Sequence, residues 1–126
     1  MDISELIGEV SEKGKITKLE VVGIKEAFKD TSRIPPDRLD KMKGRDFLRI
    51  TVKYSGGEFT EAHQIPKGLK YQNGKWQKVD KLSLARSLHN QASWFRAFIK
   101  NYKDLPSEDM EIDITLNERG FARIKI

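Results

Sequence analysis

Alternation of apolar and polar residues identifies the clearest strand of this chain, "FLRITVKY" at Phe47–Tyr54. The even-numbered residues, Leu48 to Tyr54, are apolar or aromatic and are expected to face a core. The odd-numbered residues, Phe47 to Lys53, point the other way. "SGG" at 55–57 predicts a hairpin turn, and residues 58–65 form the expected return strand, which Pro66 stops.

Three further strands are expected at residues 15–28, 110–116 and 121–126. The first changes its apolar phase near Gly23, which predicts a bulge or a sharp bend there. In the second, the alternating residues from Met110 to Leu116 face the core. Residues 29–45 are irregular around Pro35-Pro36, with one or two helical turns expected in "PDRLDKMKG".

Apolar spacings of three and four predict one long helix over residues 81–103, capped by Asp80 or Ser83 and followed by Pro106. Its expected apolar stripe consists of Leu84, Leu88, Ala92, Phe95, Ile99 and Tyr102. Trp94 and Phe98 flank that stripe. A second, short helix is expected over residues 2–9.

The segment "KYQNGKW" predicts a small extra hairpin, because Asn73-Gly74 suits a type I′ turn with positive φ at both residues. Counting back from the turn, Tyr71 pairs with Trp76 on one face. The two rings either pack against the core or remain open as a platform for nucleotide bases. A ring face covered by the helix would favour packing.

These elements predict one α+β domain over residues 1–126, with a five-stranded, mainly antiparallel sheet, one long helix and the extra hairpin. The order β-β-β-α-β-β, with a long bent first strand, resembles the OB-fold, a Greek-key barrel that often binds oligonucleotides. An open sheet with the helix across one face explains the same order. Both arrangements therefore stay open.

The resemblance to the OB-fold implies a binding face on the second and third strands and on the loops beside them. On the strands these positions are Phe47, Arg49, Thr51, Lys53, Phe59 and His63. The loop at 29–45 adds Arg33, Arg38, Lys41 and Lys43. A half-exposed strand with an ordinary polar outer face explains Arg49 and Lys53 equally well.

Composition limits the classes of function. The 126 residues contain no cysteine, which excludes disulfides and thiol catalysis, and no apolar run is long enough for a membrane span. The acidic start "MDISELIGEV" is unlike a signal peptide, so a cytoplasmic protein is expected. Abundant Lys and Glu are typical of thermophilic proteins. We expect no membrane partner and no small-molecule cofactor.

Charge is concentrated in one third of the chain. Residues 62–103 hold nine lysines and arginines against one acid, Asp80, a net charge of +8 in a chain whose total is +5. Both tryptophans lie in the same third. Cations interleaved with aromatic rings are what single-stranded nucleic acid needs, for its phosphates and for its bases. The candidate binding residues are Tyr71, Lys75, Trp76, Lys78, Arg86, Arg96, Lys100, Arg49 and Lys53.

The leading hypothesis is therefore a small non-enzymatic protein that binds nucleic acid, single strands in preference to duplex. The alternative is a protein-interaction or self-assembly module, such as a homodimer, that associates through the helix or an edge strand. An acidic protein surface is the rival partner for the basic helix face. A solvated helix face with ordinary core aromatics explains the same residues.

Catalytic chemistry has little support in the sequence. His63 and His89 are the only histidines, and no serine lies in a nucleophile motif. No phosphate loop and no zinc motif is present, so no catalytic residue, metal or cofactor is assigned. The acidic residues Glu108, Asp109, Glu111 and Asp113 leave a metal-dependent nuclease as a distant third hypothesis. A solvated or edge-protecting strand face explains them better.

Overall fold

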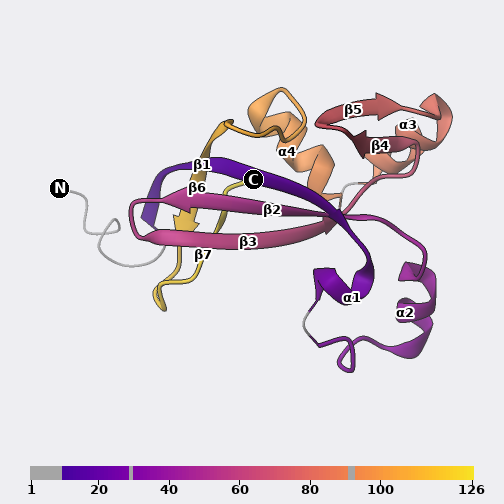
Figure 1. The fold of residues 1–126 in the computed structure, drawn as a ribbon, viewed down its shortest axis with the longest axis horizontal. Helices are drawn as coiled ribbons and strands as arrows, with labels where there is room; N and C mark the ends of the chain where they lie inside the picture. Colours follow the sequence, from indigo (N-terminus) through magenta and orange to yellow (C-terminus); the bar gives the residue numbers. More distant parts are fainter. Residues whose placement is uncertain (1–9, 29, 91–92) are drawn as a thin grey trace.

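The computed structural model describes residues 10–28, 30–90 and 93–126, so the helix expected over residues 2–9 lies outside the described residues. Figure 1 shows the arrangement of the elements. In chain order they are β1 (Val10–Val22), α1 (Ile24–Ala27), α2 (Pro36–Met42), β2 (Phe47–Tyr54), β3 (Gly57–Gln64), β4 (Leu69–Gln72), β5 (Lys75–Lys78), α3 (Lys81–His89), α4 (Trp94–Tyr102), β6 (Glu111–Leu116) and β7 (Ala122–Ile124).

Five antiparallel strands form the main sheet in the order β3-β2-β1-β6-β7. The long strand β1 pairs with β2 through residues 14–22 and with β6 through residues 10–15. The outer strands β3 and β7 also meet, since the Glu61 carboxylate accepts a hydrogen bond from the Ile124 amide. The sheet is therefore nearly closed into a barrel, and the expected α+β, OB-like fold is confirmed.

The barrel interior is built from the strand faces that the alternation predicted. Leu48, Ile50 and Val52 of β2 are fully buried, as is Ile114 of β6. Gly14 of β1 lies between these strands, where a Cβ atom would come within 3.1 Å of side-chain atoms of both Val52 and Ile114. A larger residue at this position would force the central strands apart.

The first strand differs from its prediction at both ends. β1 begins at Val10 and ends at Val22, and its register shift lies between Ile16 and Lys18 rather than at Gly23. Gly23 is instead the N-cap of α1, where the Glu26 carboxylate accepts a hydrogen bond from the Gly23 amide at 2.8 Å. The expected strand over 15–28 is thus wrong beyond residue 22, where local capping turns the chain into a helix.

The outer face of β2 is more buried than a solvated strand face. Phe47 is 2% exposed, and its ring lies edge-on to Phe28, just past the end of α1, at 5.5 Å. Thr51 on the same face is also buried. α2 supplies the helical turns expected in residues 29–45.

The single helix expected over residues 81–103 is wrong, because the chain forms two helices of nine residues, α3 and α4. Asp80 caps α3 as expected. Ser93 caps α4, its Oγ accepting from the Arg96 amide at 3.3 Å, while Arg96 Nη1 donates to the His89 carbonyl at the end of α3. The break also changes the buried face, since Phe98, expected beside the stripe, is fully buried.

The small hairpin of β4 and β5 has the predicted register, with Tyr71 opposite Trp76 and Gln72 opposite Lys75. Asn73 and Gly74 both have positive φ, 53° and 74°, as a type I′ turn requires. The hairpin lies beside α3 and α4, at one end of the barrel (Figure 1).

Candidate nucleic-acid interface

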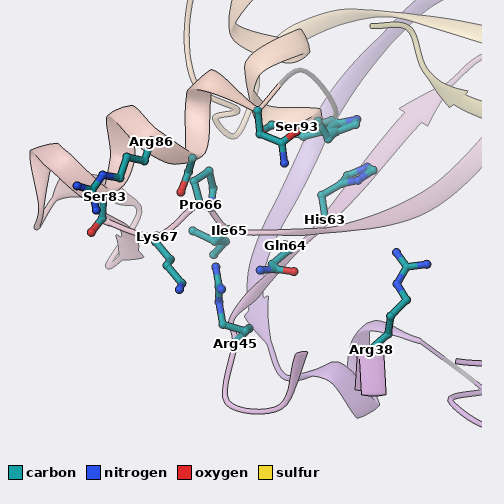
Figure 2. A pocket seen from close by; sticks show the side chains of 13 residues that line it. Arg38, Arg45, His63, Gln64, Ile65, Pro66, Lys67, Ser83, Arg86 and Ser93 are labelled. Atoms are coloured by element: carbon teal, nitrogen blue, oxygen red, sulfur yellow. The ribbon is translucent and has the colours of Figure 1, made fainter. Parts of the chain in front are cut away.

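A groove of about 780 Å³ lies between the end of β3, the α2 side of the barrel and the helices α3 and α4. Figure 2 shows side chains that line it, with Arg38 and Arg45 on the α2 side and Ser83 and Arg86 on the α3 side. The lining residues are Arg38, Arg45, His63, Gln64, Ile65, Pro66, Lys67, Ser83, Arg86, Ser87, Asn90, Ser93 and Trp94.

The groove is strongly basic. Four of its lining residues are Lys or Arg, and none is Asp or Glu. Within the described ranges, Arg38, Lys67 and Arg86 form no ion pair with a carboxylate. The Arg45 guanidinium faces the Gln64 side-chain amide, and with that amide turned so that its oxygen points at the arginine, the oxygen accepts from Nη2 at 2.8 Å. A groove with these charges favours an anionic ligand.

Local structure brings these cations together from distant parts of the sequence. Arg38 lies on α2, and Arg45 lies two residues before β2, next to Asp46, whose carbonyl accepts from the Ile65 amide at 2.9 Å. Gly68 places Lys67 beside α3, because its carbonyl accepts from the Val79 amide at 2.8 Å. Gly68 has a φ of +86°, and a Cβ atom there would lie 2.2 Å from the Asp80 carbonyl oxygen, so this junction requires glycine.

One end of the groove is aromatic. The rings of His63, on β3, and Trp94, at the start of α4, stack with centroids 4.0 Å apart and an angle of 7° between their planes. His63 Nε2 lies 2.8 Å from the Glu61 carboxylate. Both rings also line a second, adjoining hollow of about 460 Å³. The groove thus combines cations with an ordered pair of rings.

The aromatic hairpin that the sequence singled out is packed rather than open. The rings of Tyr71 and Trp76 lie 4.8 Å apart, and Trp76 meets Phe95 of α4 edge-on at 5.8 Å. The Trp76 indole also donates to the Pro106 carbonyl at 2.7 Å. Burial raises the pKa of the Tyr71 hydroxyl above its ordinary value. The covered ring face favours the packing explanation of this hairpin.

The predicted cations lie on several surfaces. Arg86 lines the groove, whereas Lys75 and Lys78 are exposed on the hairpin and Lys100 is exposed on α4. Arg96 lies at the junction of α3 and α4, where its guanidinium binds the His89 carbonyl. The structure therefore brings only one residue of the predicted set into the groove.

The outer face of β2 carries the remaining two candidates. Arg49 is paired with Glu20 of β1, its Nη2 3.1 Å from the carboxylate, and this hydrogen bond lowers the pKa of Glu20 below its usual value. Lys53 is exposed and lies opposite Glu58 in the ladder. Both cations therefore have a carboxylate residue as a neighbour on the adjacent strand. The role of Arg49 and Lys53 in binding stays a prediction.

Sequence reasoning left Arg45, Lys67 and Trp94 out of the candidate set, and it gave Arg38 and His63 as binding positions only through the resemblance to the OB-fold. Lys67 and Trp94 lie inside the basic, aromatic third of the chain, so composition points to them without placing them. Nothing local distinguishes Arg45 from other surface arginines. Arg45 lies in the groove because the pairing of β2 with β3 brings it beside the end of β3.

The acidic cluster is engaged by lysines of β1. Asp113 lies 2.6 Å from Lys13, and Asp109 lies 3.8 Å from Lys15. Among residues 10–28, 30–90 and 93–126, no group of three or more His, Asp or Glu side chains is placed to hold a metal ion. The Lys13–Asp113 pair thus joins β1 and β6, whereas Asp109 lies before the start of β6.

No protein-family model matches this chain, and neither curated proteins nor solved structures give a match. Within the described part of the chain, no helix has the length and apolar character to cross a membrane. Large exposed apolar side chains include Val79 and Leu82 beside the start of α3, each 62% exposed. Self-association through the helix or an edge strand stays a prediction.

Proposed function

We propose that this protein binds single-stranded nucleic acid in the basic groove and catalyses no reaction on it. The observation that carries the proposal is the combination, in one groove, of four cationic side chains, no carboxylate and a stacked ring pair. Cations attract the phosphate backbone, and the counterions that the phosphates release on binding supply most of the affinity.

The ring pair favours single strands over duplex. In a duplex the faces of the bases are stacked on one another, and only their edges are exposed in the grooves. An unpaired base presents its face, which stacks on protein rings whatever its sequence. An aromatic wall next to cations therefore suits a single strand.

A salt titration of binding tests the proposal. The affinity of the protein for a fluorescent thymidine decamer is measured by anisotropy at several salt concentrations, beside a duplex of the same length. We expect a linear fall of log K with log salt, with a slope of about −0.7 for each phosphate contacted. Arg86→Gln and Lys67→Gln should each weaken binding and make the slope shallower by about 0.7.

Lys75→Gln and Lys78→Gln are the matched controls, because they remove the same charge from the hairpin, outside the groove. They should change affinity and slope less than the groove variants do. If the hairpin variants lose as much affinity as the groove variants or more, the hairpin and not the groove is the binding surface. Failure of the wild-type protein to bind either oligonucleotide at low salt would refute the function.

A further inference from the structure

Four aromatic rings form a continuous column that ends at the groove. Along α4, Tyr102 contacts Phe98 at 4.6 Å, and Phe98 stacks on Trp94 at 5.0 Å. Trp94 in turn stacks on His63 of β3 at 4.0 Å. Among the described residues His63 has a ring contact with Trp94 alone, so it is the terminal ring of the column.

The His63 ring is held in a fixed orientation. Nε2 lies 2.8 Å from Glu61 Oε1, and the second oxygen of that carboxylate accepts from the Ile124 amide of β7. Trp94 holds the ring plane nearly parallel to its own. A side chain locked by packing and by hydrogen bonds loses little conformational entropy when a ligand stacks on it.

His63 is also accessible to a ligand. Its side chain is 23% exposed, and it lines both the basic groove and the adjoining hollow. Trp94, by comparison, is already stacked against His63 and Phe98. The ring that the column offers to the groove is therefore the imidazole of His63.

We infer that His63 is the base-stacking platform of this protein, with one nucleobase of the bound strand extending the ring column while the groove cations hold the neighbouring phosphates. The inference rests on the proposed function and adds the residue that contacts the base. The inference assigns base stacking to His63 of β3 in place of Trp76, which packs against α4.

Two substitutions separate stacking from a structural role of His63. His63→Phe keeps an aromatic ring and removes the hydrogen bond to Glu61. His63→Gln keeps an N–H donor for Glu61 and removes the ring. Stacking predicts that the Phe variant keeps most of the wild-type affinity for the thymidine decamer, while the Gln variant binds about 5- to 150-fold more weakly than the wild type. A role that acts through Glu61 predicts the reverse order.

A second ligand isolates the contribution of the base. An abasic decamer has the same phosphates without bases, so the wild type and His63→Gln should bind it equally. His89→Ala, which changes the exposed histidine of α3 outside the groove lining, should bind both ligands like the wild type. Thermal melts of all variants verify that each one is folded.

Several outcomes would overturn the inference while leaving the proposed function intact. These are unchanged thymidine binding by His63→Gln, a greater loss in His63→Phe than in His63→Gln, or equal wild-type affinity for the thymidine and abasic decamers. Absence of wild-type binding to both ligands would instead refute the function itself, and the inference with it.

Discussion

The Trp76 side chain combines ring packing with a hydrogen bond. Its ring packs between Tyr71 and Phe95, and its N–H donates to the carbonyl of the buried Pro106. A large aromatic residue with one polar atom suits a site that is apolar at one end and holds a hydrogen-bond acceptor at the other. This role fastens the hairpin to the barrel end and needs no ligand.

Replacing Trp76 should therefore affect stability and leave binding intact. Trp76→Phe keeps a ring but leaves the Pro106 carbonyl without its donor, which should cost about 1–3 kcal/mol of unfolding free energy. Urea denaturation measures this loss. The variant also retains Trp94 as its only tryptophan, and the fluorescence of Trp94 should still be quenched by the thymidine decamer. If Trp76→Phe is as stable as the wild type but its fluorescence is no longer quenched, Trp76 of the hairpin is the residue that stacks on the bases.

At the scale of elements, the break between α3 and α4 is what allows the ring column to form. Ser93 starts a new helix, and the Arg96 guanidinium binds the last turn of the preceding one. As a result Phe98 enters the core while Trp94 reaches His63. A helix with uninterrupted period would have kept both residues beside the apolar stripe.

The start of α3 predicts a specific acid sensitivity. Hydrogen bonds from the amide and hydroxyl of Ser83 lower the pKa of the Asp80 carboxyl below its ordinary value of 3.8. The folded state therefore favours ionised Asp80. This stabilisation is complete above the pKa of the unfolded chain and is lost as pH falls through the lower pKa of the folded protein.

Asp80→Asn provides the comparison, because asparagine caps a helix well and does not titrate. The difference in melting temperature between the wild type and this variant should be constant near neutral pH. At pH values below about 4, the wild type should lose stability relative to the variant. Asp80→Ala, which removes the cap, should melt below both at neutral pH. A difference between wild type and Asn variant that is independent of pH would contradict this role of the carboxylate.

On the scale of the whole molecule, the seam between β3 and β7 decides whether the sheet is a barrel. Glu61 bridges that seam, because one carboxylate binds both the Ile124 amide of β7 and His63 of β3. Side chains of Glu61 and His63 are 17% and 23% exposed, so this bridge is largely shielded from solvent. The same carboxylate thus links barrel closure to the orientation of the groove ring.

Removal of this bridge should loosen β7 before the rest of the barrel. Glu61→Ala should increase hydrogen exchange at the Ile124 amide and lower the unfolding free energy by about 1.5–3 kcal/mol, the range for hydrogen bonds to a charged group. Glu58→Ala, at an exposed position of the same strand, is the control and should leave β7 exchange unchanged. Unaltered exchange in Glu61→Ala would show that other contacts close the seam.

Features that depend on neighbouring residues could be predicted from the amino-acid sequence. Alternation placed Leu48, Ile50 and Val52 in the core, and Asn73-Gly74 set the register of the small hairpin, because side-chain direction and turn geometry repeat over a few residues. The order of these elements was sufficient to indicate an OB-like fold.

The barrel closure, the division of the helix and the groove could not be predicted from local sequence, because they depend on how distant segments pack together. Whole strands of the sequence separate Arg38 and Arg45 from Lys67 and Arg86, and His63 of β3 meets Trp94 of α4. The local periodicity of the sequence does not predict such contacts. They depend on how the strands close into a barrel and on how α4 packs across its end. Packing therefore selected which cations and rings of a basic chain share one surface.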